Sequence, residues 1–217
     1  MLAPTSDDPF ARLQQQHGGG LALAHLVAGG LDLLPMPGSG QTLARWQRLA
    51  AVAAHDLSLA KLYEGHTDAL AILAELGGPT AATGTRWGTW CAEPPDARLA
   101  FSQDGAGTDL TIDGTKAWCS GAHALTHAVV SGWDAAGAPC LAAVALDQPG
   151  VRITDDGWKA VGMAASGSVD VVFDGARGVA VGAPGDYTRR PGIWHGGAGA
   201  AEPAGRDARA AMPEPGP

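Results

Sequence analysis

The stretch Asp113-Gly114-Thr115-Lys116-Ala117-Trp118-Cys119-Ser120-Gly121 decides how the second half of this chain is interpreted. Its Asp-Gly pair is typical of a tight hairpin turn, and the residues that follow are typical of a strand. Because side chains two positions apart on a strand face the same way, Trp118 and Ser120 are predicted to lie side by side. The stretch therefore predicts an apolar plate next to a hydroxyl group, which suits one face of a planar ring with polar edges. The alternatives are a core tryptophan and a serine at a solvated strand end.

Short runs rich in Val, Thr, Ile and Trp occur on both sides of this stretch, separated by Gly, Asp and Pro. Asp155-Asp156-Gly157 and Gln148-Pro149-Gly150 are predicted turns. Short strands at such spacing are typical of a small antiparallel barrel or sandwich. The predicted strands are 108–112, 116–120, 127–133, 140–146, 151–154 and 168–173.

The residues before Pro79 follow a helical period instead. Asp8 and Pro9 predict the start of a short helix. Residues 21–34 are predicted to form a second helix. Thr42 is predicted to cap a longer helix whose apolar side chains recur every three or four positions and are expected to pack in the core. This apolar stripe consists of Leu43, Trp46, Leu49, Ala53, Leu57 and Ala60. His66, with Glu64 and Asp68, is expected on the solvated face of this helical region.

The change of period predicts an α+β fold: a helical N-terminal domain over 1–79, then a small antiparallel β-barrel or sandwich over 80–187. The remaining residues, 188–217, are interpreted as a truncated junction and a tail. Because 200–217 hold almost no large apolar side chain, that tail is expected to be disordered.

Charge and composition exclude several classes of partner. The formal net charge is −8, and no cluster of Lys and Arg is present, which argues against nucleic acid or a membrane surface as a partner. Cys91, Cys119 and Cys140 are odd in number and widely spaced, so we expect free thiols, no structural zinc, and a cytoplasmic location. The N-terminus lacks the basic region of a secretory signal.

Several short segments, in this order, resemble the acyl-CoA dehydrogenase family. Trp-Cys-Ala-Glu-Pro at 90–94 resembles the segment that opens the β domain of the family, and Gly-Thr-Lys-Ala-Trp-Cys-Ser at 114–120 resembles its Gly-x-Lys-x-Trp-Ile-Thr segment. The turn at 146–151 and the segments Gly-x-x-x-Ser at 162–166 and Val-x-Phe-Asp from 171 also match.

The resemblance implies a flavoprotein oxidoreductase that holds FAD and removes hydrogen from the α and β carbons of an acyl-CoA thioester. Electrons would pass to an electron-transferring flavoprotein, and the chain would be a homo-oligomer. Trp118 would pack on the isoalloxazine ring, Ser120 would hydrogen-bond near its N5 atom, and Cys91 and Ala92 would present backbone groups to it. A related flavin monooxygenase would share the same scaffold.

Three departures from the family pattern bear on this expectation. Ala92 stands where the family has a threonine, and Ala97 and Arg98 replace a Gly and a Ser of a small-residue loop. Arg98 is therefore either a surface residue or a new phosphate contact. No residue corresponds to the catalytic base, which the family carries on a C-terminal helical bundle. The chain is thus expected to be a truncated or split enzyme of doubtful activity on its own; the alternative is a noncatalytic remnant or binding module.

Overall fold

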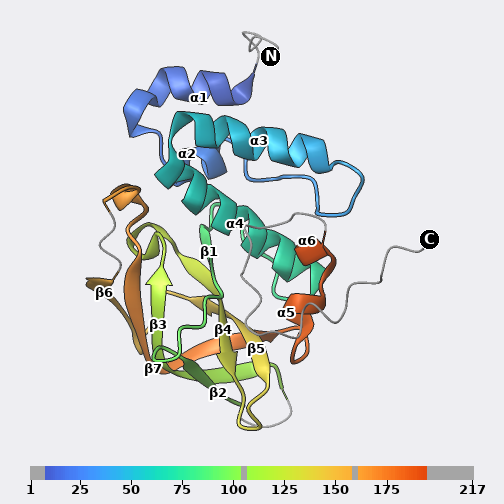
Figure 1. The fold of residues 1–217 in the computed structure, drawn as a ribbon, viewed down its shortest axis with the longest axis vertical. Coiled ribbons are helices and arrows are strands. Elements are labelled where there is room, and N and C mark those ends of the chain that lie inside the picture. Colours follow the sequence, from blue (N-terminus) through green and yellow to red (C-terminus); the bar gives the residue numbers. More distant parts are fainter. Residues whose placement is uncertain (1–7, 104–106, 158–160, 195–217) are drawn as a thin grey trace, which may run out of the picture.

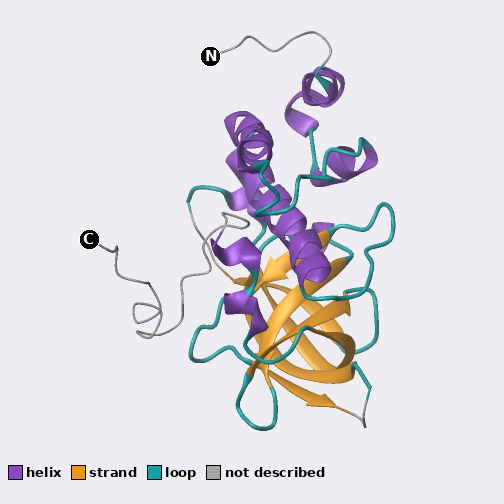
Figure 2. Ribbon diagram, turned by 90° about the vertical axis from the view of Figure 1, so that its right-hand side faces the viewer, coloured by secondary structure: helices purple, strands orange, loops and turns teal. Residues whose placement is uncertain are grey.

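The computed structural model describes residues 8–103, 107–157 and 161–194. In it a helical layer lies above a β-barrel (Figure 1), and Figure 2 shows the same division between helices and strands from the side. This arrangement confirms the predicted α+β fold, whereas the predicted tail at 200–217 lies outside the described residues. The helical elements are α1 Pro9–His17, η1 Gly18–Gly20, α2 Leu23–Ala28, α3 Thr42–His55, α4 Leu57–Glu75, η2 Ala122–Ala124, η3 Ala164–Ser166, α5 Asp186–Arg189 and α6 Pro191–Trp194.

Within the described residues one sheet holds all the strands and closes on itself. Its order is β1-β4-β2-β3-β7-β5, β5 pairs again with β4, and β6 pairs with β7. Most pairs are antiparallel, but β4 is parallel to both β1 and β2. The strands are β1 Trp87–Trp90, β2 Leu99–Gln103, β3 Asp109–Cys119, β4 His127–Trp133, β5 Pro139–Ala145, β6 Val151–Gly157 and β7 Val169–Val181.

The Asp113-Gly114 pair does not form the predicted hairpin turn. β3 runs through it without interruption, and the register with β7 shifts between Ile112 and Gly114. Gly114 has a φ of 120°, and a Cβ there would collide with the carbonyl oxygen of Arg98 on the neighbouring segment. Asp113 accepts a hydrogen bond from the backbone N–H of Gly175 at 2.7 Å. The glycine is therefore required by the close approach of two strands, not by a turn.

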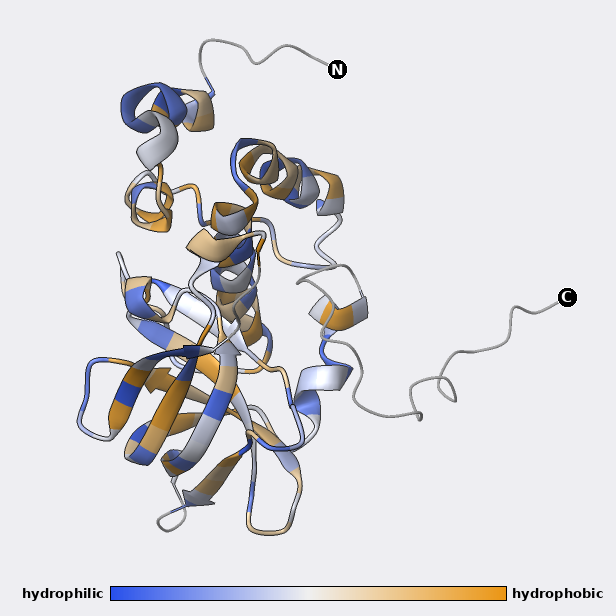
Figure 3. Ribbon diagram, turned by 60° about the vertical axis from the view of Figure 1, so that its left-hand side comes forward, coloured by the Kyte–Doolittle hydropathy of each residue, from blue (hydrophilic) through white to orange (hydrophobic). Residues whose placement is uncertain are grey.

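The predicted turn at Asp155-Asp156-Gly157 is also wrong, because these residues belong to β6, where the register shifts before Gly157. Burial alternates at the start of β2 but not along β4 and β5, whose central residues are all buried. Figure 3 shows both hydrophilic and hydrophobic residues on the barrel strands.

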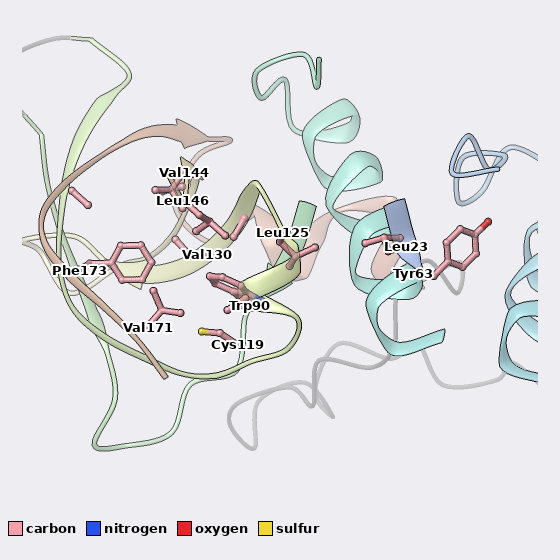
Figure 4. Packing of buried hydrophobic residues seen from close by; sticks show 14 of the residues in the cluster. Leu23, Tyr63, Trp90, Cys119, Leu125, Val130, Val144, Leu146, Val171 and Phe173 are labelled. Atoms are coloured by element: carbon pink, nitrogen blue, oxygen red, sulfur yellow. The ribbon is translucent and has the colours of Figure 1, made fainter. Parts of the chain in front are cut away.

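One apolar core joins the barrel to the helices. It runs from Phe173 and Val171 inside the barrel, past Trp90 and Leu125, to Tyr63 on α4 (Figure 4). Tyr63 is fully buried and donates a hydrogen bond to the carbonyl oxygen of Leu31 at 2.5 Å. Packing between α4 and β1 thus continues the barrel interior into the helical layer.

Only part of the predicted apolar stripe meets the core, since Leu49 and Ala60 are partly buried and pack against it. Leu43 and Trp46 on α3 are 68% and 52% exposed, whereas Arg45 and Val52 are buried. The helix also ends sooner than expected, since Asp56 has extended backbone angles and its carboxylate caps α4 by accepting a hydrogen bond from the Leu59 N–H at 2.6 Å. This break changes the phase of the helical period, so that Leu57 is exposed.

The prediction that His66 and Asp68 are solvated is wrong, because both side chains are buried. The Nδ1 atom of His66 accepts a hydrogen bond from the Trp87 N–H at 3.0 Å, and its Nε2 lies 3.2 Å from Asp32. Burial lowers the pKa of His66 despite that carboxylate, which favours a neutral ring that donates to Asp32. His66 therefore ties the start of β1 to the helical layer.

Asp68 anchors the short helices that follow the barrel. Arg190, between α5 and α6, is buried and donates to Asp68 at 2.6 Å and to Glu75 at 2.8 Å. Its guanidinium carbon also lies 5.4 Å from the ring centre of Tyr187. The end of the described chain is thus held against α4 by buried charges. In the part of the chain described here, no helix is long and apolar enough to cross a membrane.

Replacing Gly114 by alanine is expected to destabilise the fold by about 2–4 kcal/mol, because the new Cβ meets backbone and the φ value is unfavourable. Urea unfolding measures this change. Gly137→Ala is the matched control, since Gly137 also has a positive φ but a Cβ at that position would have no atom within 4 Å. Equal losses of unfolding free energy in the two variants would contradict the explanation that the close approach of two strands requires a glycine at position 114.

Arg190→Met is expected to cost about 3–5 kcal/mol of unfolding free energy, because it leaves buried Asp68 without its countercharge. The neighbouring Arg189→Met variant should change stability little, since the Arg189 side chain is 66% exposed. Chemical denaturation of both variants at pH 7 checks the prediction, which fails if the two variants unfold at the same urea concentration.

Candidate functional site

Trp118 lies at the end of β3 in an unusual backbone conformation. Its φ is 60°, and its side chain is 52% exposed between the buried residues Ala117 and Cys119. Lys116 pairs with Val171 and Cys119 pairs with Val169, so three steps along β3 correspond to two steps along β7. This β-bulge turns the indole out of the barrel, and a left-handed conformation of a bulky residue costs roughly 1–3 kcal/mol. The fold thus maintains a strained arrangement that exposes an aromatic face.

Ser120 follows the bulge and is partly exposed. Its hydroxyl lies 2.8 Å from that of Ser168, which lies 3.3 Å from that of Ser166. The Gly121 N–H donates to the carbonyl oxygen of Ser166 at 2.7 Å, so the end of β3 is fixed to η3. We call the three side chains of Ser120, Ser168 and Ser166 the hydroxyl row. Trp118 and Ser120 are therefore both accessible, although the bulge, rather than regular alternation, produces this arrangement.

Cys91 and Ala92 form the segment directly after β1. Cys91 is partly buried and Ala92 is exposed. Burial raises the pKa of the Cys91 thiol to about 12, so this group is a neutral thiol and no nucleophile at neutral pH. Among the described residues, no group of three His, Cys, Asp or Glu side chains could hold a metal ion.

Contacts on both sides hold this segment beside the end of β3. Before it, the indole N–H of Trp90 donates to the carbonyl oxygen of Ser120 at 3.2 Å. After it, Glu93 accepts a hydrogen bond from the Lys116 ammonium at 2.8 Å. The structure therefore brings together the two segments that carry all four predicted site residues.

The Lys116 ammonium is fully buried inside the barrel wall and donates three hydrogen bonds. Besides Glu93, its acceptors are the carbonyl oxygen of Ser131 at 2.9 Å and the hydroxyl of that residue at 2.8 Å. Glu93 also accepts from the Ser131 hydroxyl and, at 3.2 Å, from the Trp133 indole. Each buried charge is thus paired and hydrogen-bonded, which is the condition for tolerating it.

The same contacts keep Glu93 ionised. Burial raises the pKa of its carboxyl group, but hydrogen bonds from Lys116 and Ser131 and the charge of Lys116 outweigh burial, so the pKa falls below its ordinary value. Arg98 stacks on Trp133, with its guanidinium carbon 5.0 Å from the ring centre. Arg98 therefore has a structural contact, and its predicted role toward a phosphate stays a prediction.

Helix α4 closes the other side of the Ser120 segment. A crevice between α4, β1 and Ser120 has a volume of only about 10 Å³, enough for one water at most. Gly121 has a φ of 75°, and a Cβ there would lie 2.5 Å from a methyl group of Leu62 on α4. The hydroxyl of Thr89 donates to the carbonyl oxygen of Gly65 at 2.8 Å. The helix and the barrel are therefore in direct contact here, which closes the base of the site.

The larger cavity, of about 590 Å³, lies elsewhere. It is lined by Asp109, at the start of β3, and by His127 and Arg177, whereas Trp118 lies at the other end of β3 and is not among its lining residues. The Arg177 guanidinium donates to Thr111 at 2.8 Å, and His127 stacks on Trp87 with ring centres 4.6 Å apart. These polar groups already have partners, and the cavity is separate from the Trp118 site.

Sequence reasoning missed the contribution of Ser168 and the pairing of Lys116 with Glu93. Lys116 lies two positions before Trp118 inside an otherwise apolar barrel strand, and a lysine in that pattern indicates a buried ion pair. Ser168 carries no such signal, because it lies between η3 and β7 and its partner Ser120 is 48 residues away along the chain. The lysine pattern does not identify Glu93, which lies 23 residues away.

No family model matches this chain, and no curated protein matches its sequence. Solved structures do match. The protein FkbI, which serves biosynthesis of a methoxymalonyl extender unit, is 22% identical with a TM-score of 0.67; the match covers 82% of this chain and 59% of FkbI. Dibenzothiophene monooxygenase TdsC from Paenibacillus sp. A11-2 is 22% identical with a TM-score of 0.62, over 83% of this chain and 52% of TdsC.

Methanesulfinate monooxygenase MsuC from Pseudomonas fluorescens is 22% identical with a TM-score of 0.60, over 82% of this chain and 51% of MsuC. TdsC has also been crystallised with FMN. These proteins are relatives with the acyl-CoA dehydrogenase fold, and at these identities the likeness establishes the fold alone. The chain spans a little over half of the length of these solved structures.

Lys116→Met is expected to destabilise the protein by about 3 kcal/mol at pH 7, because the partly buried carboxylate of Glu93 would be left without its countercharge. The pKa of Glu93 is lowered in the folded chain, so this carboxylate stabilises the fold above its ordinary pKa of 4.5 and the contribution is lost as the pH falls below that value. The loss of unfolding free energy caused by Lys116→Met should therefore be smaller at pH 4 than at pH 7.

Urea unfolding at both pH values measures the effect. Lys61→Met is the control, because the Lys61–Glu64 pair lies on the surface, where ion pairs contribute little. A loss for Lys116→Met that is independent of pH would show that packing, not charge, explains the role of Lys116.

Proposed function

We propose that this chain carries the flavin-facing half of an oxidoreductase site and that the flavin is FMN. The observation that carries the proposal is the indole of Trp118, which a strained β-bulge holds exposed beside the hydroxyl of Ser120. Other tryptophans, such as Trp46, are equally exposed, but Trp118 is also held in a left-handed conformation that costs roughly 1–3 kcal/mol, and a ring stacked on its indole would offset that cost.

The residues present fit a flavin ring. Trp118 offers a flat apolar surface large enough to cover one ring face, and Ser120 offers a hydroxyl that can both donate and accept. Cys91 and Ala92 provide an adjacent segment without a charged side chain. A bound flavin would supply the two-electron redox chemistry, in which the ring accepts a hydride or, when reduced, reacts with oxygen. The chain itself orients the ring and shields one of its faces.

The choice of FMN over FAD follows from the segment after Glu93. A loop that cradles the additional phosphate and adenosine of FAD needs small residues so that backbone can approach closely. Here Pro95, Ala97 and Arg98 follow, and Arg98 is stacked on Trp133. The crystallisation of TdsC with FMN supports the same choice, and by analogy with TdsC and MsuC the reaction of the whole protein would be a monooxygenation.

FAD-dependent dehydrogenation of an acyl-CoA is the second candidate, favoured by the motifs at 90–94 and 114–120, whose residues the structure brings together. Titration of the purified chain with FMN and with FAD, followed by flavin fluorescence, separates the two. FMN binding that is at least tenfold tighter than FAD binding supports the first proposal. The reverse order supports the second, and no binding of either flavin supports a noncatalytic module.

Trp118→Ala is expected to weaken flavin binding by about tenfold or more, since stacking of a flat ring on an aromatic side chain contributes roughly 1–3 kcal/mol. Trp46→Ala is the matched control, because Trp46 is equally exposed but lies on α3, away from β3. Circular dichroism establishes that both variants are folded. If the two variants bind flavin as the unaltered protein does, the flavin site does not include Trp118.

A further inference from the structure

The hydroxyl row runs from the partly exposed Ser120 into the protein. Ser168 and Ser166 are only 8% and 6% exposed, so a ligand can touch Ser120 but not the two serines behind it. The Ser120 hydroxyl has the Ser168 hydroxyl as its hydrogen-bond partner, at 2.8 Å. The Ser168–Ser166 distance is longer, at 3.3 Å. Ser168 therefore connects the accessible hydroxyl to the buried one.

Backbone strain lies on both sides of this row. Trp118 and Met163 are the two non-glycine residues with a positive φ in the described part of the chain, at 60° and 58°. The carbonyl oxygen of Met163 accepts from the Ser166 N–H at 2.9 Å, and that of Ser166 accepts from the Gly121 N–H. Strained conformations persist where the surrounding structure determines them and often belong to binding sites. Here they fix the ends of the two segments that carry the serines.

We propose that Ser168 is a positioning residue that sets the direction in which the Ser120 hydroxyl points toward the ligand. A hydroxyl has one proton and two lone pairs. When Ser168 donates to Ser120, the proton of Ser120 is free to be donated to an acceptor on the ligand. When Ser120 donates to Ser168 instead, a lone pair of Ser120 is free to accept a ligand N–H.

The inference rests on the proposed flavin site, and it deepens that proposal. The N5 atom of an oxidised flavin is an acceptor, and in the reduced flavin it carries a proton and is a donor. The hydroxyl row can reverse its direction because both of its contacts join two hydroxyl groups, either of which can be the donor. Ser120 can therefore serve both states of the ring without moving, provided that Ser168 is present as its second partner.

The experiment compares binding of FMN and of 5-deaza-FMN, in which a C–H group replaces N5, to the full chain and its variants. Ser168→Ala should weaken FMN binding about fivefold, the usual value of one hydrogen bond, and leave 5-deaza-FMN binding unchanged. Ser168→Thr, which keeps the hydroxyl, should restore FMN affinity. Ser120→Ala/Ser168→Ala should bind FMN no more weakly than Ser120→Ala, because Ser168 acts through Ser120.

Ser58→Ala is the control, since Ser58 is buried to a similar extent but lies at the start of α4. An equal loss of FMN and 5-deaza-FMN binding in Ser168→Ala would overturn the inference and assign the serine a purely structural role. FMN binding that is unchanged in Ser168→Ala would overturn it while the proposed function stands. Failure of the unaltered chain to bind either flavin would overturn both.

Discussion

The buried ammonium group of Lys116 is the constraint on which the candidate site depends. An unpaired charge inside a barrel is too costly to keep, so Lys116 requires Glu93 and Ser131 at hydrogen-bonding distance. Meeting that requirement fixes the loop after β1 against β3. The bulge at Trp118 begins two residues further along the same strand, and the strain there is tolerated because its base is held on both sides. A polar pair in the barrel wall thus determines the position of an apolar surface outside it.

Much of the fold could be predicted from the period of the sequence. The helical start at Pro9, the strand at 127–133 and the turn at Gly150 agree with the structure because each depends on neighbours along the chain. Asp113 and Gly114 indicate a turn when only their neighbours in sequence are considered, because Asp-Gly pairs favour turns locally. Only the position of Arg98 on the adjacent segment shows that the glycine is needed for another reason. Strands β1 and β2 are not among the predicted strands.

The errors in the helical half have a similar cause. The stripe from Leu43 onward has helical spacing, but spacing does not say which of its residues meet the core. Leu49 packs against the core, whereas Leu43 is exposed and Arg45 is buried. Arg45 can be buried because its guanidinium donates to the carbonyl oxygens of Pro35 and Thr67. His66 and Asp68 are buried for the same reason, with partners at Asp32 and Arg190 that are remote in sequence. For the candidate site, sequence identified Trp118 and Ser120, whereas Ser168 became apparent only in three dimensions.

The parallel pairing of β1 with β4 has a consequence for the order in which the chain folds. Trp87 pairs with His127. The entropic cost of this contact is lower once the chain between the two residues has formed the β2–β3 hairpin. β1 is short and is also held by α4 through Thr89. We therefore expect the local antiparallel pairs β2–β3, β4–β5 and β6–β7 to form early and β1 to dock after them, bringing Cys91 and Ala92 with it. The surface that would receive a ring would then form only after these local pairs, so chains at that early stage would present no competing site.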